Sequence, residues 1–190
     1  LRRRGIPNWG VFGRKDLQGG GPMIDIGVHV VEMAHYFMGS PKPVAATGNC
    51  WTYLGDKPSE VMSMWPNWDY KTYTVEDLAC AMIKFKNGAT LELDAAWASN
   101  IKENEQMSTR ILGDKGGLYQ YNLNEGYTWD AEYYQDMEGR QFDSKLHSSP
   151  EVRNAFWLFA DAVRDDTPFL VQPEEGVVVM RLLDAIYESA

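Results

Sequence analysis

An acid and a histidine lie four residues apart in an otherwise apolar segment, GGGPMIDIGVHVVEMAHYFMG, over residues 19–39. On a helix, residues three or four apart share one face. The stripe predicted on this basis comprises Asp25, His29, Glu32 and Tyr36, with the apolar residues Ile26, Val30, Met33 and Phe37 on the opposite side. The polar face is therefore expected to line a site, while the apolar face packs into the core.

Asp25 and His29 have the side chains that proton transfer requires. An imidazole takes up and releases a proton near neutral pH, and a carboxylate one turn away can fix its tautomer and stabilise its charged form. Each residue alone also has a simpler explanation. An acid is favoured in the first turn by the helix dipole, and a histidine can be purely structural. The pair together predicts the removal of a proton from a hydroxyl, with Asp25 and His29 as candidate catalytic residues.

Other residues give weaker signals. Glycines at 19–21 would let a ligand or a cofactor ring approach the backbone, but neither they nor residues 113–117 have the spacing of a nucleotide-binding loop. His35 lies on a different helix face from His29, so no metal site is expected. Trp65 and Trp68, in a long aromatic loop over 55–74, could stack on a sugar ring or simply anchor that loop. Glu32, Tyr36, Trp65 and Trp68 are the candidate substrate-binding residues.

The hydrophobic pattern predicts a single α+β domain over residues 1–190, with a large, open-faced, mainly antiparallel sheet and helices on one face. Pro22 at a first helical position and Gly39 after the last apolar residue bound the first helix. The expected elements are helices over 23–38, 150–164 and 173–189, and strands over 44–54, 107–112 and 118–121, besides a hairpin around residue 87.

The hairpin is predicted from Asn87-Gly88, a typical two-residue turn. That turn pairs Lys86 with Ala89 and Met82 with Leu93. One face then contains Leu78, Cys80, Met82, Lys84, Leu91, Leu93, Ala95 and Trp97, and its apolar character assigns it to the core. The other face contains Ala79, Ala81, Ile83, Phe85, Thr90, Glu92, Asp94 and Ala96, and its mixed character predicts a subunit interface.

The composition narrows the partners. The net charge is -9 and the sequence pI about 4.8, which argues against nucleic acid and anionic membranes as partners. No apolar run is long enough to cross a bilayer. Cys50 and Cys80 are too few for a disulfide scaffold, so reduced thiols in a cytoplasmic protein are expected.

Several blocks together resemble the C-terminal half of the glucose–fructose oxidoreductase/inositol dehydrogenase (Gfo/Idh/MocA) family. They are GGGPMIDIGVH, VVEMAHYFMG, VEDLACAMIKFKNGATLEL, ILGDKGG and DAIYESA, in the family's order. The resemblance implies a two-domain oxidoreductase of sugars, polyols or related hydroxy compounds. It implies NAD or NADP as cofactor, bound mainly by an N-terminal Rossmann half with a Glu-Lys-Pro lysine that this chain does not contain.

By motif position, the resemblance makes His29 the family's acid/base histidine and Asp25 the aspartate that holds the substrate hydroxyl. It also implies homodimers or tetramers formed through the sheet face. Without the Rossmann half, these 190 residues are expected to be inactive alone and to contain no cofactor site of their own. The alternative is a non-catalytic binding or assembly module that keeps the fold.

Overall fold

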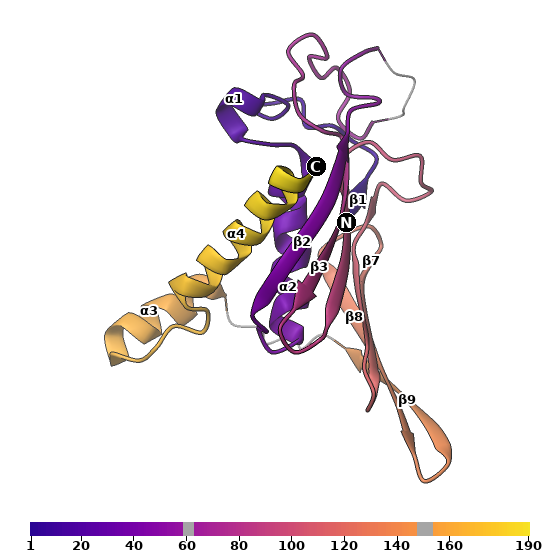
Figure 1. The fold of residues 1–190 in the computed structure, drawn as a ribbon, viewed down its shortest axis with the longest axis vertical. Helices are drawn as coiled ribbons and strands as arrows, with labels where there is room; N and C mark the ends of the chain where they lie inside the picture. Colours follow the sequence, from indigo (N-terminus) through magenta and orange to yellow (C-terminus); the bar gives the residue numbers. More distant parts are fainter. Residues whose placement is uncertain (59–62, 148–153) are drawn as a thin grey trace.

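Two sheets organise the chain in the computed structural model, which describes residues 1–58, 63–147 and 154–190 (Figure 1). The first sheet has five strands in the order β2-β3-β4-β1-β5, and the second has four in the order β6-β7-β8-β9. The first contains β1 (Arg2–Arg3), β2 (Pro43–Trp51), β3 (Leu78–Phe85), β4 (Thr90–Ala96) and β5 (Glu105–Gln106). The second contains β6 (Ser108–Leu112), β7 (Gly117–Leu123), β8 (Thr128–Met137) and β9 (Arg140–His147).

The predicted α+β class with mainly antiparallel strands is confirmed, since only the pairing of β1 with β4 is parallel among the named strands. The chain passes directly from one sheet to the other, because β5 ends at Gln106 and β6 begins at Ser108. The helical elements are α1 (Lys15–Gln18), the π-helix η1 (Met23–Gly27), α2 (Val28–Phe37), α3 (Ala155–Asp165) and α4 (Pro173–Ser189).

The core lies between the five-stranded sheet and two helices, α2 and α4, that cover one of its faces (Figure 1). From the predicted apolar stripe, Ile26 and Val30 are buried, whereas Phe37 is exposed near the end of α2. The apolar face of α4 contributes Val179, Leu182, Leu183 and Ile186. Burial of such side chains contributes roughly 1.5–3 kcal/mol each, so this layer fixes α2 on the sheet.

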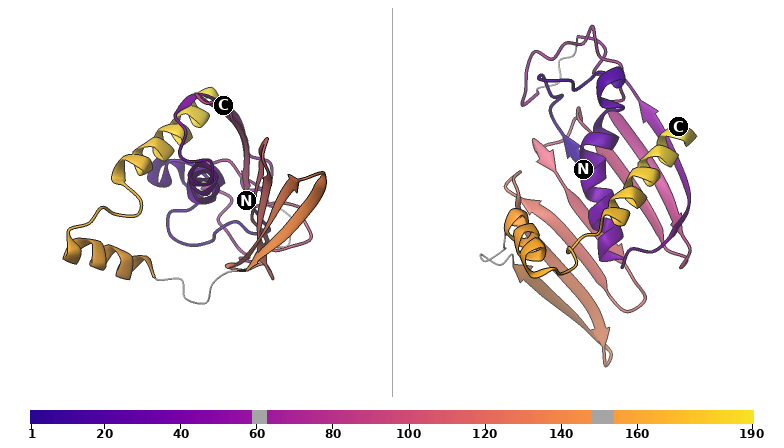
Figure 2. Two further views of the ribbon diagram at one scale, coloured as in Figure 1. Left: turned by 90° about the horizontal axis from the view of Figure 1, so that it is seen from below. Right: turned by 90° about the vertical axis from the view of Figure 1, so that its left-hand side faces the viewer.

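Helix α4 spans the predicted residues because its start is strongly capped. Gln172 and Glu175 form a reciprocal capping box around Pro173. Helix α3 begins after Asn154, whose side chain accepts a hydrogen bond from the backbone of Phe156 at 2.8 Å. The predicted start of that helix, over 150–153, lies outside the described residues. In the left-hand view of Figure 2, α3 stands apart from both sheets.

The predicted hairpin register is wrong by one residue. Met82 pairs with Glu92 and Lys84 with Thr90, so the loop has three residues. The reason is that, of the two turn residues Asn87 and Gly88, only Gly88 adopts a positive φ, of 91°. The Asn87 side chain instead accepts a hydrogen bond from the backbone N–H of Ala89 at 3.1 Å. This geometry is typical of the three-residue hairpin loop rather than the two-residue turn.

The slip inverts the predicted faces of β3, because side chains alternate along a strand. Ala79, Ala81, Ile83 and Phe85, predicted at an interface, are buried against the helices. Leu78, Cys80, Met82 and Lys84, predicted in the core, belong to the opposite face, where Met82 is 39% exposed. On β4, Leu93 and Ala95 do enter the core as predicted. The assignment of the β3 interface is therefore corrected: the open face of the sheet contains the alternate residues.

Strands β8 and β9 were not predicted from the sequence. They form a long hairpin in which Met137 pairs with Arg140 across a two-residue turn. Both turn residues, Glu138 and Gly139, have positive φ angles, of 51° and 71°. This is the conformation of a type I′ turn, reached here without the Asn-Gly or Asp-Gly sequence that usually signals it.

Candidate functional site

Asp25 lies in the π-helix η1, where its carboxylate is partly buried. Its Oδ2 accepts a hydrogen bond of 3.0 Å from Nε1 of Trp97, a fully buried residue that follows β4 directly. Short π-helical turns within helices are frequent at functional sites. The structure therefore fixes one oxygen of the predicted catalytic acid.

His29 lies in the first turn of α2 and is exposed. Within the described part of the chain, no hydrogen bond or ion pair joins it to Asp25, whose polar partner is Trp97. The predicted stripe is thus not uniform, since Asp25 is partly buried and His29 faces solvent. An exposed imidazole one turn from a fixed carboxylate can still meet a hydroxyl group, because catalytic hydrogen bonds often form only with substrate.

The start of η1 is held by a buried carboxylate, Glu76. Its two oxygens accept hydrogen bonds from the backbone of Gly21 at 2.9 Å and Met23 at 3.1 Å. The hydroxyl of Tyr187, near the end of α4, donates to Glu76 at 2.8 Å and accepts from the backbone of Ile24 at 3.2 Å. A buried carboxylate is stabilised by such donors. Glu76 and Tyr187 therefore set where the helix bearing Asp25 and His29 begins.

This contact explains the glycines that precede the helix. A Cβ on Gly20 would lie 2.2 Å from the Tyr187 hydroxyl, and one on Gly21 would lie 2.1 Å from the Glu76 carbonyl oxygen. The space at these glycines is thus filled by the chain itself. The expectation that they admit a ligand or a cofactor ring is replaced by close packing within the domain.

The neighbouring acid, Asp77, holds a second segment. Its Oδ2 accepts backbone hydrogen bonds from Tyr53, Leu54 and Gly55 at 2.6–2.9 Å. Neither Glu76 nor Asp77 was predicted to have a role. The sequence signal that could have identified them is two consecutive acids directly before a strongly apolar strand. Acids in such a position are drawn into the protein interior, where they require hydrogen-bond partners from elsewhere in the fold.

Glu32 and Tyr36, predicted to bind substrate, line a mainly apolar hollow of about 500 Å³ between α2 and α4. Val28, Val179 and Met180 are among its other lining residues. Neither Asp25 nor His29 is among its lining residues, so the structure places Glu32 and Tyr36 further along the helix than the candidate catalytic residues.

His35, on a different helix face from His29, is buried. Its Nε2 lies 2.9 Å from the carbonyl oxygen of Pro41, and its ring stacks on Phe85 with centroids 5.8 Å apart. No group of three or more His, Cys, Asp or Glu side chains among the described residues is placed to hold a metal ion. Burial raises the pKa of the Cys50 thiol to about 11, which makes it a poor nucleophile at neutral pH.

The two tryptophans of the long loop differ in their surroundings. Trp68 donates through Nε1 to the carbonyl of Gly55 at 2.9 Å and packs on the core, as an anchor does. Trp65 contacts Trp9 edge to face, with ring centroids 4.9 Å apart. Trp9 in turn contacts Phe12, and Phe12 contacts Trp97, with centroids 5.6 and 6.1 Å apart. Of the two, Trp65 is therefore the one linked through aromatic contacts to Asp25.

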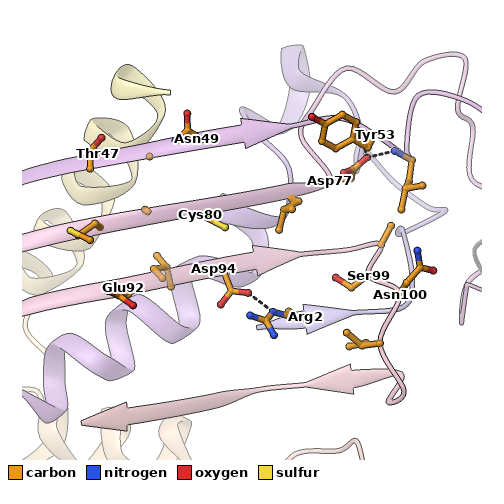
Figure 3. Close-up of a pocket in the computed structure, with 18 residues that line it drawn as sticks. Arg2, Thr47, Asn49, Tyr53, Asp77, Cys80, Glu92, Asp94, Ser99 and Asn100 are labelled. Atoms are coloured by element: carbon orange, nitrogen blue, oxygen red, sulfur yellow. Dashed lines mark hydrogen bonds and ion pairs between the residues drawn. The ribbon is translucent and has the colours of Figure 1, made fainter. Parts of the chain in front are cut away.

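A hollow of about 970 Å³ lies on the other side of the sheet, away from the helices (Figure 3). Its polar lining includes Asn49, Glu92, Asp94, Ser99 and Asn100. Arg2 forms an ion pair with Asp94 there. This open face is thus polar at its edges and apolar at its centre, where Leu78, Cys80 and Met82 line it.

Fold and site together define an α+β domain with a candidate proton-transferring pair, Asp25 and His29. Just before this pair, Gly20 and Gly21 pack closely against Tyr187 and Glu76 of the same chain. The chain belongs to the Gfo/Idh/MocA oxidoreductase family, whose C-terminal alpha/beta domain profile matches residues 2–190. The resemblance stated from the sequence is therefore confirmed. No helix in the described part of the chain is long and apolar enough to cross a bilayer.

A curated relative, the D-glucoside 3-dehydrogenase of Escherichia coli K12, is 33% identical over 190 residues, which are all of this chain and 52% of that protein. Two solved structures share the fold over the whole chain. The aldose-aldose oxidoreductase of Caulobacter crescentus has a TM-score of 0.72, 21% identity and 50% of its chain covered. A levoglucosan dehydrogenase complexed with NADH and levoglucosan has a TM-score of 0.72, 19% identity and 54% covered. The chain thus spans about half the length of these relatives.

Proposed function

We propose that the chain is the substrate-binding half of an NAD(P)-dependent dehydrogenase of a sugar, polyol or related hydroxy compound. The observation that carries this proposal is Asp25 held by Trp97 one turn before an exposed His29, within a family of oxidoreductases. The similarity to a D-glucoside dehydrogenase supports a sugar-like substrate.

In the proposed oxidation, a ring nitrogen of His29 accepts the hydroxyl proton of the substrate. Asp25 orients that hydroxyl through its carboxylate. Such a positioned proton transfer typically contributes ~10²–10⁴-fold in rate. The nicotinamide, when bound, supplies the acceptor for the hydride that leaves the same carbon. The domain's own contribution is the placement of the hydroxyl and the proton.

The cofactor is proposed to be bound mainly by a further half of the protein. The half-length match to the relatives supports this. So does the packing at Gly20 and Gly21, where the chain's own Tyr187 and Glu76 occupy the space next to the helix start. A helix start closed in this way does not fit a cofactor phosphate, which needs free backbone N–H groups.

Helix α3 supports the same two-domain arrangement. Its apolar side chains are widely exposed, with Phe156 at 84% and Trp157 at 67%. Exposed apolar patches of this kind mark surfaces that pack against another body. We assign this surface to contact with the remaining half of the protein.

A direct test is the oxidation of a sugar panel by the full-length protein with NAD⁺ or NADP⁺. The panel contains methyl β-D-glucoside, levoglucosan and D-xylose, and reduction of the nicotinamide is followed by absorbance. Turnover of a panel member that His29→Ala abolishes supports the proposal. If the panel and further polyols all fail while the protein binds a sugar, the non-catalytic binding module is favoured instead.

A further inference from the structure

Trp97 is held rigidly from several sides. Its backbone N–H donates to the carbonyl of Asp77 at 3.0 Å, and its own carbonyl accepts from Gly5 at 2.6 Å. The ring is fully buried and contacts Phe12 and Tyr73 in edge-to-face geometry, with centroids 6.1 and 6.5 Å away. A ring that is packed and bonded in this way has a single orientation.

The polar end of this ring points at the candidate site. Nε1 of Trp97 donates to Oδ2 of Asp25 at 3.0 Å, across 72 residues of sequence. Indole nitrogen is a donor only, so the contact requires an acceptor on Asp25. Within the described residues, Oδ2 accepts the hydrogen bond from Trp97 and Oδ1 accepts none. One carboxylate oxygen is therefore held, and the other is left for a ligand or for His29.

We propose that Trp97 is a positioning residue for the reaction, an inference that rests on the proposed function of Asp25 and His29. By fixing Oδ2, it sets the direction of Oδ1 before the substrate arrives. Such pre-organisation lowers the cost of aligning a reacting hydroxyl with its base. Trp97 does not touch the substrate in this account and acts through Asp25.

A double-mutant cycle in the full-length enzyme tests this role, because it measures coupling between the two residues. Trp97→Phe keeps an aromatic ring and removes the N–H donor. We expect it to lower kcat/KM for an oxidised panel sugar about tenfold in the wild type. In the Asp25→Ala background we expect a change of less than about twofold, because the carboxylate that Trp97 positions is gone.

The matched control is Trp129→Phe, which trims a partly buried tryptophan of β8 in the other sheet. We expect it to keep wild-type turnover. Equal losses from Trp97→Phe in both backgrounds, or no loss in either, would overturn the inference. If Asp25→Ala itself keeps full turnover, the proposed function fails. If Asp25→Ala is impaired but Trp97→Phe is not, the proposed function stands and only the role of Trp97 fails.

A measurement without turnover covers the case in which Trp97→Phe does not fold. Indole N–H signals in ¹H–¹⁵N spectra report the hydrogen bonds of tryptophans directly. In the full-length protein, Asp25→Ala should shift one indole signal that His29→Ala leaves in place. If no indole signal moves in Asp25→Ala, the proposed contact between Trp97 and Asp25 is absent and the inference is wrong.

Discussion

Tyr187 and Glu76 join the last helix to the start of the helix that bears the candidate site. The Tyr187 hydroxyl donates to Glu76 Oε1 at 2.8 Å, while Glu76 also accepts from the backbone of Gly21 and Met23. The two residues lie 111 positions apart in the sequence. The position of Asp25 and His29 on the sheet therefore depends on α4 as well as on their own segment.

Removal of this hydroxyl should destabilise the protein. Tyr187→Phe leaves Glu76 with one donor fewer and costs about 1–3 kcal/mol, the usual range for a buried group that loses a partner. Urea unfolding at neutral pH measures the loss. Tyr36→Phe is the control, because its ring is exposed and we expect no change there. Equal stability of wild type and Tyr187→Phe would mean that the contact does not hold the helix start.

The same tyrosine predicts a pH dependence. Burial, the main cause, raises the pKa of Tyr187 above its ordinary value of 10.0, and burial likewise raises the pKa of Tyr73. Because the folded state retains these protons longer, their contribution to stability is complete below pH 10 and falls as the pH rises above it. Above pH 10, the free energy of unfolding should therefore fall less steeply with pH in Tyr187→Phe than in the wild type. Parallel curves for the two proteins would contradict the assignment.

The open face of the five-stranded sheet is the surface we propose for self-association. Its apolar centre, with Met82 at 39% exposure, and its polar edges resemble a subunit contact. Met82→Lys in the full-length protein should shift sedimentation equilibrium toward monomer without lowering the melting temperature. Ile83→Lys, one residue along, should instead unfold the protein because Ile83 is fully buried. A wild type that stays monomeric at every concentration would contradict this interface.

Local signals predicted much of this fold. The helix over 23–38 and the helix over 173–189 followed from apolar periodicity and from Pro22, Gly39 and Pro173, and both formed close to the expected bounds. The β8–β9 hairpin was missed because the burial of β8 does not alternate cleanly and because Glu138-Gly139 is an unusual turn sequence. Local sequence determines both the two helices and this hairpin, but the helices carry a stronger sequence signal than the hairpin does.

The candidate site was predictable only in part. Asp25 and His29 could be proposed as candidates because their spacing is local. Trp97 was assigned to the core from an incorrect register, and its hydrogen bond to Asp25 depends on the tertiary fold. The hairpin error shows the limit clearly: whether Asn87 or only Gly88 takes a positive φ decides which side of β3 faces the helices.

The isolated chain should not bind NAD(H). Gly20 and Gly21, just before η1, are packed against Tyr187 and Glu76, which leaves no cradle for the cofactor phosphates at these two residues. Titration calorimetry of residues 1–190 with NADH should show no saturable heat, while the full-length protein binds. An NADH site of micromolar affinity on the isolated chain would contradict the proposal that the other half of the protein binds the cofactor.

The most direct test of the central claim is the turnover of His29→Ala in the full-length protein, measured beside its thermal melt. Because His29 is exposed, its removal should leave the melting temperature nearly unchanged. If its ring accepts the hydroxyl proton, kcat for the oxidised sugar should fall about 10²-fold or more, with a smaller fall in Asp25→Asn. Retained turnover per folded molecule, or a large loss of stability with normal kcat, would contradict a proton-transferring role for His29.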